Sequence, residues 1–287
     1  MYIDNLREEK RIGTAGLHEL TLKYFEQKFR NCYLQVFSRS DVTAFERHLF
    51  NLDMNQTTVS MHMKRLKVIV NAAVKDGMVE YKIHPFTYYR MPEPLIRNLD
   101  IDIDEIKKIR DLKIEKTKTG ISAARDIFML SYYLGGINMV DLLEIDFSRM
   151  DEVRYTRKKT ANTKRGERII CFSIPPEAIP ILKKRVGKNG KLDFGFNYTY
   201  DNFRKYMGKC IKIISEKCGI EKRICYYSTR MSFAQHGFES GIATEVLEYL
   251  IGQSMKTNRP LYNYIKVMKK QADVAIRIIL DNLKERE

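Results

Sequence analysis

The sequence predicts a mainly α-helical protein built from a small helical domain and an α-rich domain with a small antiparallel sheet. Three observations lead to this fold class. Apolar residues recur at helical spacing over much of the chain, a proline-containing stretch interrupts the pattern at residues 91–100, and β-like composition is confined to residues 152–158 and 168–174. The length of 287 residues fits one large domain or two modest ones.

The clearest helix is expected over residues 57–77. Its apolar side chains recur at steps of four, three, four and three residues: Val59, Met63, Leu66, Val70 and Ala73. Thr57 or Thr58 is predicted to cap the start, and Gly77 to close the end. Earlier helices are expected over residues 14–28 and 41–51. Residues 1–90 are therefore predicted to form a small all-helical domain.

Residues 91–100 contain two prolines and are predicted to be a linker. Asp102 and Glu105 have the spacing of a capping box, so a second domain is expected over residues 101–287. In this domain a hairpin is predicted from residues 152–158 and 168–174. Its helices are expected over residues 125–134, before Gly135 and Gly136, after Pro175 and Pro176, and over residues 199–217, 229–239, 244–251 and 266–284.

The composition excludes several classes of protein. Five scattered cysteines without a CxxC pair argue against a disulfide framework or a zinc site, and favour the cytoplasm. The longest uncharged run has 14 residues, which is short for a membrane span, and the N-terminus is too charged for a signal peptide. The five histidines have no ligand spacing and the common nucleotide-binding motifs are missing, so neither a metal nor a cofactor is expected.

The positive charge is concentrated in the second predicted domain. The chain has 51 basic and 36 acidic residues, giving +15; residues 1–100 contribute +3 and residues 101–287 contribute +12. Such a surface attracts nucleic acid, anionic lipid or acidic proteins, or serves only solubility. Seven basic residues cluster on the hairpin, which favours phosphate contact. The basic residues predicted to bind nucleic acid are Lys64 and Lys67 of the clearest helix and Arg157, Lys158, Lys164 and Arg165 of the hairpin.

A set of short motifs lies between residues 226 and 264. Arg230 is part of STRMSFAQH, Gln253 is part of IGQS 23 residues later, and Tyr262 follows Gln253 by nine residues. This pattern resembles the catalytic box of the tyrosine recombinases, the phage-integrase family, in which HxxRH(S/T)FATH is followed by LGH and a nucleophilic tyrosine. The resemblance covers nearly the whole chain. Residues 1–90 are similar to the family's DNA core-binding domain and residues 101–287 to its catalytic domain.

The resemblance implies a mechanism in which a tyrosine hydroxyl attacks a DNA phosphate and leaves a 3′-phosphotyrosine. Tyr262 would be the nucleophile, with Tyr264 as its rival, and Arg230 would bind the non-bridging phosphate oxygens. Lys159 would protonate the leaving 5′-oxygen, with Lys158 or Lys164 as substitutes. His236, which matches the FATH histidine, is expected to be structural.

Three positions depart from the family pattern. Asn138 in GGINMVDL stands where the first catalytic arginine is expected, Tyr227 replaces the HxxR histidine, and Gln253 replaces the LGH histidine. Tyrosine and glutamine still donate hydrogen bonds to phosphate, whereas asparagine lacks the permanent charge of arginine. Arg125 or another basic residue is a candidate to fill this gap.

The resemblance thus implies a site-specific recombinase or integrase of a bacterial mobile element, with double-stranded DNA as its partner and no cofactor. It would be a monomer in solution that assembles into a tetramer on DNA, with accessory DNA-bending proteins as further partners. The alternatives are a noncatalytic DNA-binding relative with a degenerate active site and, more remotely, a basic protein that binds RNA or a membrane surface.

Overall fold

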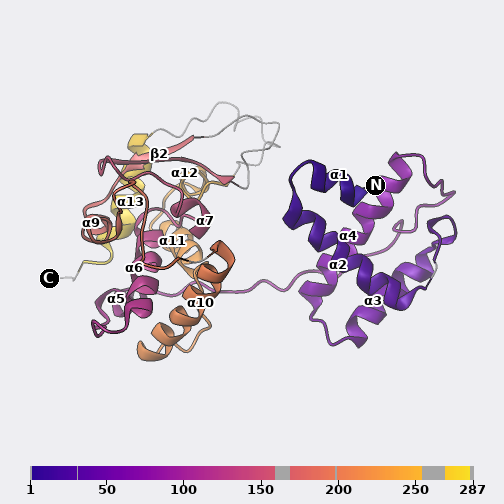
Figure 1. Cartoon of the computed structure of the whole chain (residues 1–287), viewed down its shortest axis with the longest axis horizontal. Coiled ribbons are helices and arrows are strands. Elements are labelled where there is room, and N and C mark those ends of the chain that lie inside the picture. The colour runs from indigo at the N-terminus through magenta and orange to yellow at the C-terminus, as the bar shows by residue number, and fades with distance from the viewer. Residues whose placement is uncertain (1, 31, 159–168, 198, 254–268, 285–287) are drawn as a thin grey trace. The chain divides into compact units, whose positions relative to one another are not determined.

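A computed structural model describes residues 2–30, 32–158, 169–197, 199–253 and 269–284. The chain divides into two compact units, Met1–Arg97 and Asn98–Glu287 (Figure 1). Both units are mainly helical, and the described residues contain a single two-stranded antiparallel sheet, which lies in the second unit. These features confirm the predicted fold class.

The first unit is a cluster of helices around an aromatic and aliphatic core. Its elements are α1 (Tyr2–Glu8), α2 (Ile12–Lys28), the 3₁₀ turn η1 (Leu34–Val36), α3 (Arg39–Asn51) and α4 (Gln56–Lys75). Phe25 contacts Phe37 and Phe45 edge to face at ring separations of 5.5 Å, and these rings join the apolar faces of α3 and α4. Helix α1 was not predicted. Only Leu6 of its seven residues is buried, so the sequence shows little apolar periodicity there.

Helix α4 buries all five of the apolar residues predicted to line one face. The predicted cap, Thr57 or Thr58, was wrong. Asn55 caps the helix, and its side-chain oxygen accepts a hydrogen bond from the backbone N–H of Thr58 at 3.0 Å. Gly77 follows the helix with φ +67°, a left-handed conformation that suits glycine, as predicted for this end.

The second unit is organised around α6 (Thr119–Tyr133), whose residues from Asp126 to Tyr133 are all buried. The helices around it are α5 (Ile103–Asp111), α7 (Met139–Leu142), α9 (Ile179–Arg185), α10 (Tyr200–Lys217), α11 (Ser228–Glu239), α12 (Thr244–Leu250) and α13 (Lys269–Asp281). A 3₁₀ turn, η2 (Pro176–Ala178), precedes α9. The capping box predicted from Asp102 and Glu105 is confirmed at the start of α5.

The sheet consists of β1 (Glu152–Thr156) and β2 (Ile169–Ser173), which pair with Glu152 opposite Ser173 and Thr156 opposite Ile169. This pairing confirms the predicted hairpin strands. The Asp273 carboxylate of α13 accepts hydrogen bonds from the Ser173 backbone N–H at 2.6 Å and from its hydroxyl at 2.9 Å. Helix α13 thus contacts the sheet, and its apolar side chains are buried in the core of the second unit: Ala272, Ala275, Ile276, Ile279 and Leu280.

None of the helices in the described ranges is both long and apolar enough to cross a membrane. All five cysteines are free thiols.

Candidate functional site

Arg230 lies in the first turn of α11 and is only 3% exposed. Its Nη1 donates to the Gly136 carbonyl at 3.2 Å, while its Nε and Nη2 have no hydrogen-bond partner among the described residues. Burial lowers the pKa of this guanidinium, and the nearby charge of Arg157 lowers it further. A buried cation with two unused donors is suited to bind an anion.

Gly136 allows the loop after α6 to approach Arg230 closely. Its φ is +70°, and a Cβ at this position would lie 2.8 Å from the Cα of Arg230. Hydrogen bonds hold the same loop against the start of α11: the Tyr226 hydroxyl donates to the Ile137 carbonyl at 2.7 Å, and the Ser131 and Thr229 hydroxyls are 2.7 Å apart. Every other residue type would displace Arg230 or the loop.

We expect Gly136→Ala to destabilise the second unit by at least about 2 kcal/mol, because the methyl group meets backbone and the left-handed conformation disfavours alanine. Thermal unfolding measures this loss. Gly208→Ala is the matched control: Gly208 lies inside α10, a Cβ added there would meet no atom within 4 Å, and alanine should stabilise the helix by about 0.5–1 kcal/mol. Equal melting temperatures for the two variants would contradict this account of Gly136.

Asn138 and Arg157 face each other across the site. Asn138 precedes α7, and Arg157 directly follows β1. With the Asn138 amide oriented so that its oxygen faces the guanidinium, this oxygen accepts from Arg157 Nη2 at 3.1 Å and from Nε at 3.3 Å. Arg157 Nη1 donates to the Gly252 carbonyl at 2.9 Å. The position where the family pattern has an arginine thus contacts an arginine from the strand end.

Arg125 does not fill the gap left by Asn138. Its guanidinium donates to the Leu112 carbonyl at 2.9 Å and pairs with Asp126 at 3.2 Å. Both Arg125 and Asp126 lie near the middle of α6, whereas Gly136 follows the C-terminal end of this helix. The prediction for Arg125 was therefore wrong, because buried Asp126 is its immediate neighbour and holds it.

Asp141 fixes the backbone that leaves β1. Its carboxylate is 5% exposed and accepts a hydrogen bond from the Lys158 backbone N–H at 3.0 Å. The Lys158 ammonium pairs with Glu144 at 3.1 Å, and Glu144 also pairs with Lys191 at 2.9 Å. The two lysines lower the pKa of the Glu144 carboxyl by hydrogen bonding and charge. Lys158 therefore has an acidic partner inside its own unit.

Tyr227 and Gln253 lie beside the residues that surround Arg230 and Arg157. Tyr227 immediately precedes α11 and is 46% exposed. Its charge interaction with Arg230 opposes the effect of burial on the pKa of Arg230. Gln253 is exposed and follows Gly252, the residue whose carbonyl binds Arg157. The loop of Gly136 and Asn138 thus contacts both Arg230 and Arg157, and Arg157 contacts the residue before Gln253.

Four predicted residues, Lys159, Lys164, Arg165 and Tyr262, lie outside the described residues. Tyr264, the rival of Tyr262, lies outside them too. Lys64 and Lys67 are exposed on α4 of the first unit, outside its buried apolar face. His236 is buried, and its Nδ1 is 2.8 Å from the Tyr132 hydroxyl, which agrees with the structural role predicted for it.

The sequence placed Arg157 among general phosphate contacts and did not associate it with Asn138. One signal was available: Arg157 lies at the end of a predicted strand directly before Lys158 and Lys159. Strand ends hold their side chains more firmly than the connection between strands does, so this arginine was a stronger candidate for a fixed site than the later basic residues.

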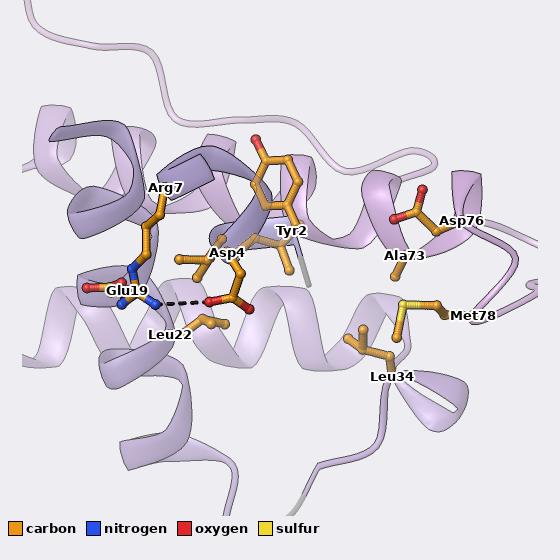
Figure 2. Close-up of a pocket in the computed structure, with 11 residues that line it drawn as sticks. Tyr2, Asp4, Arg7, Glu19, Leu22, Leu34, Ala73, Asp76 and Met78 are labelled. Carbon is orange, nitrogen blue, oxygen red and sulfur yellow. Dashed lines mark hydrogen bonds and ion pairs between the residues drawn. The ribbon is translucent and has the colours of Figure 1, made fainter. Parts of the chain in front are cut away.

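No group of histidine, cysteine or acidic side chains among the described residues could hold a metal ion. The first unit has a cavity of about 410 Å³ between α1, α2 and the end of α4. Figure 2 shows that apolar and charged side chains line it and that Arg7 points toward Asp4, to which it donates at 2.9 Å; Arg7 also pairs with Glu19. Arg7 is the only basic residue among those that line this cavity, and two carboxylates pair with it. The cavity therefore lacks an unsatisfied cation such as Arg230.

Comparison with known sequences matches the first unit to a family model and most of the chain to tyrosine recombinases. Residues 1–90 match the family model of the phage integrase SAM-like domain. A tyrosine recombinase XerD of Listeria monocytogenes is 22% identical, with 90% of this chain and 92% of the relative covered. A tyrosine recombinase of Thermosipho africanus is 23% identical over 88% of this chain and 91% of its own length.

Solved structures show the same fold. The Tn1549 transposon integrase in complex with circular intermediate DNA has a TM-score of 0.61 and 15% identity, covering 94% of this chain and 95% of that one. A lambda integrase dimer bound to a core site has a TM-score of 0.61 and 13% identity, with 88% of each chain covered. A lambda integrase tetramer bound to a Holliday junction has a TM-score of 0.62 and 14% identity, covering 88% of this chain and 71% of that one.

Proposed function

We propose that this chain is a tyrosine recombinase, a site-specific recombinase or integrase that cleaves and rejoins duplex DNA through a 3′-phosphotyrosyl intermediate. The match of residues 1–90 to the phage integrase SAM-like domain and the similarity to XerD support this proposal. The observation that carries this proposal is Arg230, a buried guanidinium with two donors unused by the described residues. In a folded protein such a group is costly, and a phosphate that accepts its hydrogen bonds gives it a function.

In the proposed reaction, the Tyr262 hydroxyl attacks the scissile phosphorus. A phosphorus–oxygen bond to the tyrosine forms as the bond to the 5′-oxygen breaks, and Lys159 donates the proton that the leaving oxygen takes up. Arg230 binds the non-bridging oxygens, with Tyr227 and Gln253 as further hydrogen-bond donors. The phosphotyrosine conserves the energy of the broken bond, so religation by a 5′-hydroxyl needs no ATP, metal or other cofactor.

The two parts of the chain would divide the contacts with DNA. We assign residues 1–90 to core binding and residues 101–287 to catalysis, with residues 91–100 as the linker. Lys64 and Lys67 on one part, and the hairpin with Lys158, Lys164 and Arg165 on the other, would contact phosphates and fix the register on the duplex. We further propose a monomer that assembles into a tetramer on DNA in the bacterial cytoplasm, with accessory DNA-bending proteins.

Covalent trapping tests the proposed function. Duplexes that the protein binds can be selected from a randomised pool, and nicks can then be placed along the selected site so that cleavage releases a short fragment and prevents religation. We expect a protein–DNA complex that survives denaturing electrophoresis and disappears after protease treatment. Tight binding to the selected duplex without any covalent complex would favour a noncatalytic DNA-binding protein.

Binding should depend strongly on salt. If the protein neutralises on the order of 6 to 10 phosphates, log K should fall against log salt with a slope of roughly −5 to −9. Fluorescence anisotropy of a labelled duplex over a range of KCl concentrations measures this slope, and a parallel series with EDTA tests the metal-free mechanism. A nearly flat slope would show that the basic surface is not the DNA-binding surface, and cleavage lost in EDTA would reject the mechanism.

A further inference from the structure

We propose that Arg157 supplies the second phosphate-binding guanidinium of the active site, in place of an arginine at position 138, and that Asn138 is a positioning residue that holds Arg157. This inference rests on the proposed function. It assigns Arg157 to the scissile phosphate, whereas the sequence placed it among the general contacts of the hairpin.

The contacts of Arg157 determine where its charge lies. The Asn138 amide oxygen accepts from two of its nitrogens, Nη2 at 3.1 Å and Nε at 3.3 Å, and the Gly252 carbonyl accepts from Nη1 at 2.9 Å. The backbone just beyond Arg157 is held by Asp141, which accepts from the Lys158 N–H at 3.0 Å. Two segments therefore hold the guanidinium in one orientation, and Asp141 holds the backbone beside it. Preorganised binding of a phosphate requires such an arrangement.

The neighbour of this guanidinium is a second cation. Arg230 is buried, and burial lowers the pKa of its guanidinium; the nearby charge of Arg157 lowers it further. Two positive groups held together in a partly dehydrated site repel each other unless an anion binds between them. A phosphodiester has two non-bridging oxygens, and its transition state carries more negative charge than its ground state. The Arg157–Arg230 pair is therefore suited to stabilise that transition state.

This arrangement also explains why asparagine is suitable at position 138. The asparagine oxygen accepts hydrogen bonds from a guanidinium and leaves its positive charge in place, whereas a carboxylate would cancel that charge. An arginine there would remove this acceptor and add a third cation beside Arg157 and Arg230. We therefore expect Asn138→Arg to slow cleavage, although it restores the residue of the family pattern.

The test measures single-turnover cleavage of nicked duplexes selected by the wild-type protein. We expect Arg157→Gln to slow cleavage by about 10²- to 10³-fold, the effect of losing one preorganised donor to a transition-state charge. Asn138→Ala should slow it by roughly 10-fold or more, because Arg157 then loses its orientation. Arg149→Gln is the matched control: Arg149 is 84% exposed and precedes β1, and its loss should change the rate by less than about threefold.

A second substrate separates an electrostatic role from a structural one. In a methylphosphonate duplex, a methyl group replaces one non-bridging oxygen of the scissile phosphate and removes its negative charge. If Arg157 acts on that charge, the deficits of Arg157→Gln and Asn138→Ala should shrink at least about tenfold on this substrate. Equal deficits on both substrates would show that these residues only support the fold, and would overturn the proposal.

Failure of this inference differs from failure of the proposed function. A wild-type protein that forms no covalent complex on its selected duplex would refute the recombinase itself. A wild-type protein that cleaves, together with an Arg157→Gln variant that cleaves within about threefold of it, would refute only the role of Arg157. Faster cleavage by Asn138→Arg would show that the site lacks a second cation, again against this inference alone.

Discussion

The Tyr262→Phe variant is expected to form no covalent complex with nicked duplex DNA while binding that DNA within about tenfold of the wild-type affinity. The substitution removes one nucleophilic oxygen and no positive charge, so the phosphate contacts that dominate affinity are retained. Denaturing electrophoresis of the trapped complex and anisotropy of the same duplex measure the two quantities. The expected change is complete loss in the first measurement and little change in the second.

Tyr264→Phe is the matched control, because it removes the same atom two residues away. We expect this variant to retain covalent attachment. Attachment that survives in Tyr262→Phe and disappears in Tyr264→Phe would identify Tyr264 as the nucleophile. Attachment that survives in each single variant and disappears in the double variant would show that either tyrosine can attack.

Replacing Arg230 by methionine is expected to have opposite effects on activity and stability. Cleavage should fall by about 10³-fold or more, since the buried guanidinium would no longer bind the non-bridging oxygens. The free energy of unfolding of the second unit should rise by about 1–2 kcal/mol, because methionine fills similar space without a desolvated charge or unsatisfied donors. For a unit of this size, that corresponds to a melting temperature higher by roughly 2–8 °C.

Single-turnover cleavage and differential scanning calorimetry measure the two effects. Arg204→Met is the control: Arg204 lies on α10, its side chain is 54% exposed, and its loss should change stability by no more than about 0.5 kcal/mol. A melting temperature lowered by Arg230→Met would mean that the Gly136 hydrogen bond and the packing of the arginine stem outweigh the cost of burial. Retained cleavage would exclude Arg230 from the phosphate site.

The elements that could be predicted from the sequence are those whose cause is local. Helix α4 follows from five apolar residues at helical spacing, α5 from the capping box of Asp102 and Glu105, and the sheet from two β-like segments around a polar connection. Each of these signals is contained within about one element, so neighbouring residues are enough to predict it. Arg230 and Gln253 were proposed as site residues from short motifs with fixed spacing, and their roles stay predictions.

The groups that meet in the candidate site are brought together by tertiary packing. Residues 138, 157 and 252 are far apart in sequence, and their hydrogen bonds depend on how the α7 loop, the end of β1 and the end of α12 pack together. Basic residues in one sequence segment resemble one another, whereas packing gives them different partners: Lys158 pairs with Glu144, and Arg157 contacts Asn138. Arg125 is held by the adjacent Asp126 and does not reach the site. The partners of a charged side chain are set by the fold, since a long flexible side chain binds whichever acceptor the packed backbone brings within reach.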